Sequence, residues 1–428
     1  MADTRDFSSN LWAATAIAAP ETPALQGDAK ADVVVVGGGF TGLSTALELA
    51  ERGADVVLLE AEEPGFGASG RNNGQVIPCY SVQNPDDVVA ELGDERGERL
   101  NAWVAASADL VFERIRRHAI DCDASQQGWL QPAHAESRLA LVRTKHDQWA
   151  ARGAPVAMFD ADEAREMTGS PVYLGGWMHK SGGHVQPLSL ARGLATAALA
   201  AGARICAGTP ATGISRVGTR WHLATPGGSV SAEHVVLATN AYSDALWPGL
   251  ARTIVPVRAY HVATQPLGDN LVAHILPGNH GFSDTRGALW AFRFDRFGRL
   301  VTTAAPVLTA GAEASARREI LDRLGIAYPQ ITEPRIEYVW EGNIAMTPER
   351  LPRFHQLGPG ISAGLGYSGR GIAMAFAMGR QLADFATGTP AEDLALPPSP
   401  LKPLPLHNLI VLLHRVLILH YRRLDARA

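Results

Sequence analysis

The feature that most constrains this chain is an apolar run that ends in glycines, Val-Val-Val-Val-Gly-Gly-Gly-Phe-Thr-Gly at residues 33–42. Such a run predicts a buried strand, a tight turn and a helix that begins directly after the turn. Gly37 would permit the turn, Gly39 would let a ligand approach the backbone, and Gly42 would let the helix pack closely on the strand. Free N–H groups at the helix N-terminus would then attract an anion.

An acidic residue stands at the end of the next apolar run. Glu60 follows Val56–Leu59, about twenty residues after the glycines, a spacing at which a carboxylate can accept hydrogen bonds from a ribose. Strand, turn, helix and acid together predict a bound ADP moiety, with its phosphates at the helix N-terminus. They leave open whether the cofactor is NAD or FAD. The predicted contacts are Gly37, Gly39, Phe40, Thr41, Gly42, Glu60 and Ala61.

Composition limits the class of protein. A chain of 428 residues, 46% of them hydrophobic, has room for two domains with packed cores. A net charge of −5 without a run of Lys and Arg argues against nucleic-acid binding. The three cysteines, Cys79, Cys122 and Cys206, show neither disulfide nor metal-ligand spacing, so no metal site is predicted. Residues 11–20 are too short and too weakly apolar for a signal peptide, and we expect a cytoplasmic protein.

The order of the predicted elements indicates a mixed α/β fold. After the first strand it runs through helix 42–52, strand 55–60, helices up to about residue 150, a helix from Pro187 to Gly202, strands 214–224, 228–231 and 235–239, and finally strand 361–363 and helix 371–387. This order predicts a Rossmann-like dinucleotide domain that is split in the sequence by a second domain. We expect the dinucleotide domain at 28–100, 170–250 and 335–390, the second domain at 101–169 and 251–334, and a C-terminal linker and amphipathic helix at 391–428.

Strand-like alternation dominates residues 255–305 and predicts a second domain built on a sheet. One face of the first strand would carry Val255, Val257, Ala259, His261 and Ala263, and the other Arg258, Tyr260, Val262 and Thr264. Residues 289–294 and 299–303 flank Asp295–Gly298 as in a hairpin, and a helix near 312–325 follows.

The C-terminal segment has a character of its own. Pro397–Pro405 reads as an extended linker, and residues 406–424 alternate apolar runs with His414, Arg415, His420, Arg422 and Arg423. Leu409–Leu413, the longest apolar run, is far below the roughly 20 residues that span a bilayer. Two interpretations remain open: a helix docked on its own protein or on a partner subunit, and a peripheral membrane helix with a basic end.

Three further segments favour a flavin. In residues 67–75, small residues would let the backbone approach a flat ring, while polar side chains could donate to phosphates or ring carbonyls. Val235–Asn240 would close the cofactor crevice beside the first strand. Gly366–Gly371 leads into a helix whose N-terminus could stabilise negative charge on a reduced ring. The predicted contacts from this part of the chain are Ser69, Gly70, Arg71, Asn72, Asn73, Gly74, Gln75, Ala211, Thr239, Asn240, Gly369, Arg370, Gly371 and Ile372.

These segments carry a family resemblance. The chain resembles the flavoproteins of the D-amino-acid-oxidase and sarcosine-oxidase superfamily (the DAO family), and most of all its gamma-glutamylputrescine oxidase branch. The matching segments are Ala31–Ala61, Gly67–Gln75, Gly183–Pro187 and Gly366–Gly371. The resemblance implies one FAD per chain, a Rossmann-like FAD-binding domain of the glutathione-reductase type, and a substrate domain of mixed β-sheet plus helices over the ring. It also implies oxidation of a C–N bond, in which hydride passes to flavin N5 and the imine product is hydrolysed.

The chain departs from the sarcosine-oxidizing members of this superfamily. Those members link FAD to a cysteine, but Gly342–Pro348 contains none, so we predict non-covalent FAD. The basic residues that hold a substrate carboxylate in those members correspond here to Pro78 and Ala373, and the oxygen-activating lysine corresponds to Leu300. A simple sarcosine-like substrate and rapid reaction with O2 do not follow from the resemblance.

Five residues are candidates for the substrate pocket. Arg293 would be either a carboxylate anchor or a surface arginine, because it points away from Trp290, Phe292 and Phe294 on a strand. Arg370 would contact phosphate or substrate, or pack at the helix end. Tyr260, Trp340 and Tyr367 would line an apolar slot or belong to the core. Outside this set, His184 would be either a participant in the site or a structural hydrogen-bonder. No side chain is an obvious base, so the flavin would carry the chemistry.

The electron acceptor separates the functional hypotheses. We predict an oxidase that passes electrons to O2 and takes a small amine or amino acid as substrate. The alternatives are a dehydrogenase that passes electrons to a quinone or protein acceptor, and a subunit of a larger flavin dehydrogenase. The acidic net charge disfavours a tRNA-modifying relative of the same superfamily.

Overall fold

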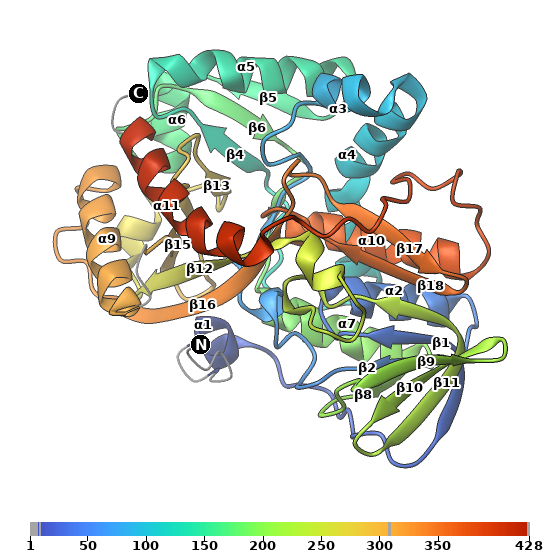
Figure 1. The fold of residues 1–428 in the computed structure, drawn as a ribbon. Helices are drawn as coiled ribbons and strands as arrows, with labels where there is room; N and C mark the ends of the chain where they lie inside the picture. The colour runs from blue at the N-terminus through green and yellow to red at the C-terminus, as the bar shows by residue number, and fades with distance from the viewer. Residues whose placement is uncertain (1–6, 8–9, 307–309, 426–428) are drawn as a thin grey trace.

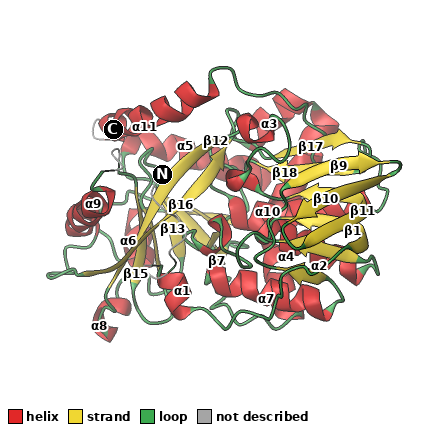
Figure 2. Ribbon diagram, turned by 60° about the horizontal axis from the view of Figure 1, so that its bottom comes forward, coloured by secondary structure: helices red, strands yellow, loops and turns green. Residues whose placement is uncertain are grey.

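Two eight-stranded sheets form the body of the chain over the part that the structure, a computed structural model, describes: residue 7 and residues 10–306 and 310–425. The sheets lie side by side, each with helices against it, as Figures 1 and 2 show. This arrangement confirms the predicted mixed α/β fold with a Rossmann-like domain and a second, sheet-based domain.

The first sheet contains the glycine-turn strand at its centre. Its order is β17-β18-β11-β1-β2-β8, and β1 pairs in parallel with both β11 and β2. Its strands are β1 (Ala29–Val36), β2 (Val56–Leu59), β8 (Arg204–Cys206), β9 (Gly213–Val217), β10 (Arg220–Thr225), β11 (Gly228–Leu237), β17 (Arg353–Gly358) and β18 (Ile361–Leu365). The carboxyl ends of β1, β2 and β11 therefore meet at one edge, where ligands bind in open α/β sheets.

The meander in this sheet differs from the predicted strands. Residues 214–224 form two strands, because the turn at Gly218, with a φ of +60°, folds β10 back onto β9. Residues 228–231 and 235–239 were predicted as separate strands but belong largely to one, since β11 pairs with β10 through its first half and with β1 along most of its length. Periodicity alone does not reveal such a shared strand.

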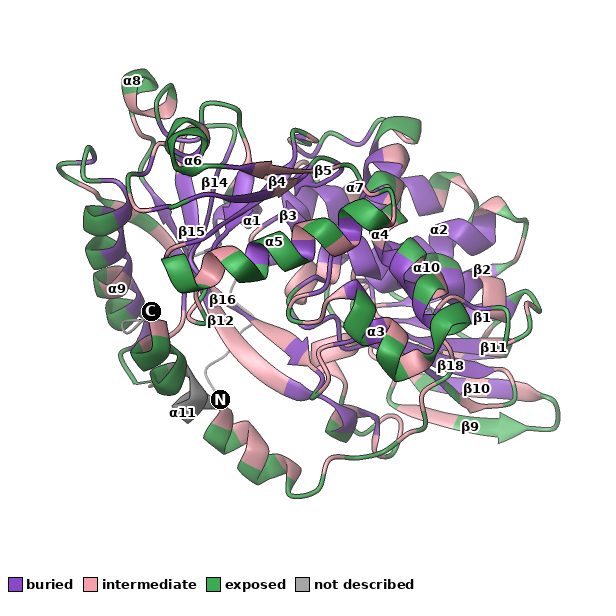
Figure 3. Ribbon diagram, turned by 90° about the horizontal axis from the view of Figure 1, so that it is seen from above, coloured by how far each residue is buried: buried purple, intermediate pink, exposed green. Residues whose placement is uncertain are grey.

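Buried helices cover one face of the first sheet. They are α2 (Phe40–Glu51), α4 (Asp94–Arg117), α7 (Pro187–Ala200) and α10 (Gly371–Ala386). Helix α2 packs against both α7 and α10, and α10 packs against α4. The contact is close enough that a Cβ on Gly379 would lie 2.6 Å from the Cβ of Ser44. Figure 3 shows α2 and α10 as buried over most of their length.

The second sheet has the order β16-β12-β15-β14-β13-β4-β6-β5. Its strands are β4 (Trp129–Pro132), β5 (Val156–Phe159), β6 (Gly176–His179), β12 (Val255–Thr264), β13 (Gly281–Ser283), β14 (Ala291–Phe294), β15 (Leu300–Ala304) and β16 (Ile336–Met346). The helices that accompany it are α5 (Glu136–Ala151), α6 (Ala161–Thr168), α8 (Asp269–Val272) and α9 (Ala312–Ala327). The spacing of Asp160 and Glu163 in the sequence predicts a capping box, and these two residues form one at the start of α6.

Two strands of the second sheet come from ranges that the sequence assigned to the dinucleotide domain. β6 pairs with β4 and β5, and β16 pairs with β12 over its full length. These pairings join residues far apart in the chain, so local patterns do not reveal them. The division into domains by residue range stays a prediction.

Short elements connect the two halves. A two-stranded ladder joins β3 (Gln75–Val76) to β7 (Gly183–His184), and α3 (Pro85–Leu92) leads into α4. An N-terminal helix, α1 (Leu11–Thr15), was not predicted; its Trp12 is fully buried and donates to the carbonyl of Asn72 at 2.8 Å. The C-terminal helix α11 (His407–Asp425) packs on β12. Among the helices the structure describes, none combines the length and apolar character needed to cross a bilayer.

A buried ion-pair network ties the helices of the first domain together. Arg114 on α4 pairs with Glu48 at 2.5 Å and with Glu51 at 2.6 Å, both on α2, and Arg380 on α10 reaches Glu48 at 3.3 Å. Burial by itself would raise the pKa of Glu48, but the two arginines lower it below its ordinary value. The stability that this carboxylate contributes is therefore lost as the pH falls through that lowered pKa.

Replacing Arg114 by Met should destabilise the protein by about 3 kcal/mol, because Glu48 and Glu51 would lose their buried arginine and keep only more exposed partners such as Arg380 and Arg117. Urea unfolding at pH 7 measures this free energy. Arg117→Met is the matched control: Arg117 also pairs with Glu51, at 3.2 Å, but its side chain is 54% exposed, so its loss should cost less than about 1 kcal/mol. Equal effects of the two substitutions would contradict the network.

Candidate active site

A cavity of about 1200 Å³ runs from the carboxyl ends of β1 and β2 to the second sheet. At one end it is lined by Val36, Leu59 and Ala211, and at the other by residues of β12 and β14. The three segments that predicted a flavin all line it. A cavity of this length and size suits an extended dinucleotide together with a small second ligand.

The glycine turn at the end of β1 has the close contacts that the sequence predicted. Gly37 has a φ of +106°, and a Cβ there would lie 3.0 Å from the carbonyl oxygen of Ala238. A Cβ on Gly42 would lie only 1.9 Å from the carbonyl oxygen of Gly37. A side chain at position 37 would push the turn away from the end of β11, and one at position 42 would push α2 away from β1. The N-terminus of α2 therefore meets the cavity only because both residues are glycine.

Glu60 closes the same end of the cavity. Its carboxylate accepts hydrogen bonds from the backbone N–H groups of Gly38 at 2.5 Å and Glu62 at 2.9 Å. Burial raises the pKa of Glu60 above its ordinary value, against the opposing effect of these N–H donors. The carboxylate is therefore held in place beside the glycine turn.

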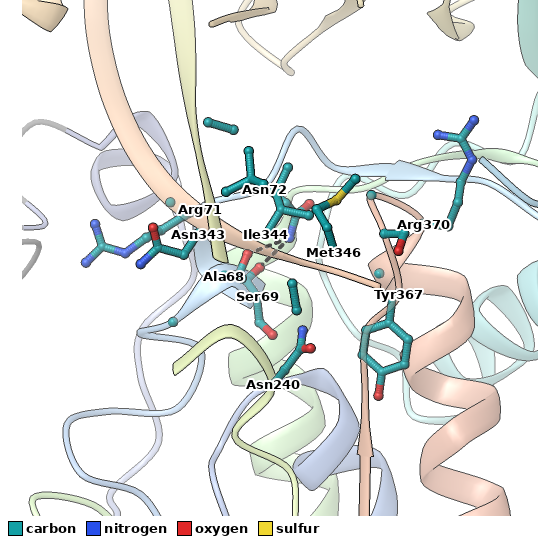
Figure 4. Close-up of a pocket in the computed structure, with 18 of the residues that line it drawn as sticks. Ala68, Ser69, Arg71, Asn72, Asn240, Asn343, Ile344, Met346, Tyr367 and Arg370 are labelled. Carbon is teal, nitrogen blue, oxygen red and sulfur yellow. Dashed lines mark hydrogen bonds between the residues drawn. The ribbon is translucent and has the colours of Figure 1, made fainter. Parts of the chain in front are cut away.

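Residues 67–75 form a loop that is fixed to the start of α2, and Figure 4 shows Ala68, Ser69, Arg71 and Asn72 of this loop at the pocket. Ser69 accepts a hydrogen bond from the N–H of Phe40 at 2.9 Å through its hydroxyl. Asn72 donates to the carbonyls of Ala68 and Ser69 at 3.1 and 2.8 Å, and accepts from the N–H of Gly74 at 2.8 Å. These bonds hold the loop in one conformation along the cavity wall.

Two side chains of this loop have partners inside the protein. The guanidinium of Arg71 points away from the centre of the pocket in Figure 4; it donates to the carbonyl of Phe66 at 2.9 Å and lies over the rings of Phe7 and Phe66. The amide of Gln75 donates to the carbonyl of Phe282 and accepts from Trp129 and Ser283, at 2.8–2.9 Å. Gln75 thus joins the loop to the second sheet.

The final glycine turn meets the first one across the cavity. The hydroxyls of Tyr367 and Thr41 lie 2.6 Å apart, and the N–H of Gly366 donates to the side chain of Asn240 at 3.0 Å. Gly369, Gly371 and Ile372 line the cavity, with Arg370 as the N-cap of α10. The structure therefore brings together all three segments and places the N-terminus of α10 at the cavity.

The predicted substrate residues divide into two groups. Tyr367 and Arg370 line the cavity, whereas Tyr260, Trp340 and Arg293 are not among its lining residues. Tyr260 belongs to the core beneath α9, where burial raises its pKa to about 12. Trp340 lies behind the loop and donates to the carbonyl of Arg71 at 2.8 Å.

Arg293 is neither exposed nor in the cavity. Its guanidinium donates to the carbonyls of Val185 and Phe294 and lies 5.1 Å from the ring of Trp12. As predicted, it points away from the aromatic face of its strand, but that side is covered by α1 and by the backbone of the loop. His184 is likewise structural: its ring bonds to Asn279, and burial lowers its pKa to about 3.

Several lining residues were not predicted as site residues. The face of β12 that carries Val257, Ala259 and His261 forms one wall, and residues 342–347, the end of β16 and the residue after it, form another. The alternation read from the sequence predicted which face of β12 they share, but not what that face contacts. Lys145 on α5 also lines the cavity; nothing in its local sequence marks it, because α5 reaches the site through tertiary packing.

Helix α11 covers the end of the cavity that faces the second sheet. Ile410, His414 and Tyr421 line the cavity. The helix is held by Asp425, which accepts hydrogen bonds from the N–H groups of Gly287 and Ala288, both at 2.8 Å, and by a 2.6 Å ion pair between Arg422 and Glu319. The inner face of α11 is thus docked on its own protein.

Comparison with known proteins agrees with this site. The family model described as FAD dependent oxidoreductase (DAO) matches residues 32–385. Gamma-glutamylputrescine oxidoreductase of Escherichia coli (strain K12) is 34% identical over 385 residues, which covers 90% of each chain.

Solved structures share the fold. Glycine oxidase from Geobacillus kaustophilus superposes with a TM-score of 0.70 at 24% identity, covering 84% of this chain and 95% of that one. L-proline dehydrogenase from P. horikoshii gives 0.69 at 20% identity, covering 85% and 94%. With its glycine turn, loop and second glycine turn around one cavity, and a family match over most of its length, this chain belongs to the DAO family of FAD-dependent oxidoreductases.

Proposed function

We propose that this enzyme oxidises the C–N bond of an amine, or of an N-substituted or gamma-glutamyl amino acid, and that O2 accepts the electrons. The observation that carries the proposal is the continuous cavity, which joins the glycine turn after β1 to a chamber on the second sheet. The name of the Escherichia coli relative supports a gamma-glutamyl amine as one substrate to test.

FAD fits the residues that line the cavity. Its phosphates would lie at the N-terminus of α2, where the backbone contacts of Gly37 and Gly42 leave no room for side chains. Glu60 would accept from the ribose, and the ring would lie between the 67–75 loop, residues 342–347 and the N-terminus of α10. None of the three cysteines is among the lining residues, which supports non-covalent binding.

The chemistry of the proposed reaction is simple. When bound, FAD supplies the acceptor for the hydride that leaves the carbon next to nitrogen. The chain's own residues would orient the amine and exclude water. His261 belongs to the chamber wall, and burial lowers its pKa to about 4, so its ring is uncharged at neutral pH. An uncharged ring at this position does not compete with the amine for a proton, and the neutral amine has the lone pair that the reaction needs; water then hydrolyses the imine product.

FAD affinity should fall as the pH falls towards the raised pKa of Glu60. The ribose would bond to the ionised carboxylate, so the protein without FAD binds more protons at this group than the protein with FAD, and affinity rises with pH. Fluorescence titration of FAD into apoprotein between pH 5 and 8 measures this trend. Glu60→Gln should weaken binding about tenfold and flatten the pH dependence. An unchanged pH dependence in this variant would show that Glu60 is not the group responsible.

The purified protein should be yellow, and acid precipitation should release all of its FAD. Under anaerobic conditions a substrate amine should bleach the flavin absorption band. Polyamines, gamma-glutamyl amines, N-alkyl amino acids, cyclic imino acids and D-amino acids form the panel to screen. If no member of the panel reduces the flavin of a fully loaded protein, the proposed reaction is wrong.

The acceptor can be tested with the same substrate. An oxidase should form one hydrogen peroxide per substrate in air, whereas a dehydrogenase should turn over only with a quinone or dye. The position that corresponds to the oxygen-activating lysine, Leu300, is fully buried and does not line the cavity. The fold does not decide the question, because a glycine oxidase and an L-proline dehydrogenase share it.

The outer face of α11 favours a second role, contact with a membrane surface or a partner subunit. Leu406, Leu409, Leu412 and Leu413 are 47–73% exposed, and Figure 3 shows the helix as largely exposed outside its docked face. Residues 394–424 contain Lys402, Arg415, Arg422 and Arg423 and no acid, in a chain of net charge −5. An exposed apolar stripe with basic residues suits an anionic membrane surface.

If α11 contacts a membrane, the wild-type protein should pellet with vesicles of phosphatidylglycerol and phosphatidylcholine. The triple substitution Leu409→Gln, Leu412→Gln and Leu413→Gln should abolish this pelleting. The matched control carries glutamine at Leu174, Leu321 and Ile326, which are also exposed but lie elsewhere. Light scattering separates the alternative: if the wild type is an oligomer that the α11 variant dissociates, and it does not pellet with vesicles, the stripe is a subunit contact.

A further inference from the structure

Two cations lie together on the wall of the cavity that faces α5. Lys145 and Arg370 both line the cavity, and they are only 4% and 7% exposed. They come from different parts of the fold, the middle of α5 and the N-cap of α10. Burial lowers the pKa of Lys145, Cys79 and Asp87 raise it, and the charge of Arg370 lowers it further.

No acid balances these charges within the described part of the chain. Lys145 donates to the carbonyls of Val82 and Gln83, at 3.3 and 3.2 Å, and neither cation forms an ion pair there. The Nε of Arg370 is buried without a hydrogen-bond partner, and its guanidinium lies 5.3 Å from the ring of Trp129. Buried charges in proteins are nearly always paired, because an unpaired one costs several kcal/mol.

Among the described residues, no acid that lines the cavity forms an ion pair with Lys145 or Arg370. Asp284 pairs with Arg286, and Asp244 accepts a hydrogen bond from the N–H of Leu246 at 2.9 Å. Glu60 accepts from backbone N–H groups at the opposite end. The excess positive charge at Lys145 and Arg370 therefore has no internal compensation.

The neighbouring polar groups on this wall add further donors. Ser81 has a buried hydroxyl without a partner, and it lines the cavity. Gln131 also lines it, and its side-chain oxygen is already taken by the indole N–H of Trp177 at 2.9 Å, which leaves the amide N–H groups to donate. Two cations, a hydroxyl and an amide nitrogen together form a recess that suits an anionic group with two oxygens.

We propose that Lys145 and Arg370 form an anchor for a carboxylate, so that the substrate is an amine that also carries an anionic group. The inference rests on the proposed function and names the substrate class of the same site. The cofactor phosphates are the other anions in the cavity, but the glycine turn that would receive them belongs to α2 and not to this wall. A substrate carboxylate is therefore the anion that these cations are free to bind.

A binding measurement tests the anchor without relying on turnover. The FAD-loaded enzyme is titrated with succinate and with its neutral analogue succinamide, and the shift of the flavin absorption band is recorded together with the midpoint of thermal unfolding. Succinate should bind at least about tenfold more tightly than succinamide. Equal affinity for the two probes would overturn the proposal.

Lys145→Met and Arg370→Met should each weaken succinate binding about tenfold or more and leave succinamide binding unchanged. The controls Lys180→Met and Arg165→Met remove the same charges from exposed positions and should leave both affinities unchanged. Without ligand, Arg370→Met should keep the thermal midpoint of the wild type or raise it, because an unpaired buried charge is removed. A lower midpoint with unchanged succinate affinity would show that Arg370 serves packing only.

Two further outcomes separate the anchor from the cofactor and from the proposed reaction. If Arg370→Met weakens FAD binding as much as succinate binding, the arginine serves the cofactor and the anchor is wrong. Matched amines that differ by one carboxylate, such as 4-(methylamino)butanoate and N-methylbutylamine, are then compared in anaerobic reduction of the flavin. If succinate binds selectively but no amine reduces the flavin, the proposed reaction is wrong and the carboxylate anchor is still supported. If both members of the pair reduce the flavin equally well, the anchor alone is wrong.

Discussion

The contact between the first turn of α2 and the end of β1 determines where the rest of the site can lie. With a Cβ on Gly42 only 1.9 Å from the carbonyl of Gly37, helix and strand are as close as backbones allow. This closeness directs the N-terminus of α2 at the cavity and lets Ser69 accept from the N–H of Phe40. The loop that follows, through Gln75, then reaches the second sheet. A small displacement at the first contact would change every later one, because each later contact is a hydrogen bond between a short side chain and a backbone group.

Local signals predicted the parts of the molecule that local chemistry determines. The glycines at 37 and 42, the acid at 60 and the capping box of Asp160 and Glu163 act through neighbours a few residues away or through backbone conformation alone. For that reason the dinucleotide-binding turn and its acid could be predicted from the sequence, together with the residues that share each face of β12. The cofactor and family also followed, since the motifs that carry them are contiguous segments.

The surroundings of a side chain could not be predicted in the same way where they come from residues far away in the sequence. Arg293 points away from its aromatic neighbours, as alternation requires, but the pattern does not show that Trp12 covers that side. Trp340 and Tyr260 are aromatic residues near the site in sequence, yet one packs behind the loop and the other beneath α9. Lys145 was not predicted as a site residue but lines the cavity. The packing of α5 alone brings this lysine there, and nothing in the local sequence indicates it.

The positions of Lys145 and Arg370 differ from the positions at which sarcosine-type relatives carry their basic residues. Pro78 and Ala373 place no charge where the sarcosine-type relatives would have one, and neither residue lines the cavity. Lys145 and Arg370 supply positive charge from α5 and from the turn before α10, so an anion held by them would lie against α5. The uncharged face of β12 and helix α11 bound the remaining space. A ligand that fills this chamber must therefore be polar at one end and tolerate an apolar wall along its length, which favours an extended amine over a compact one.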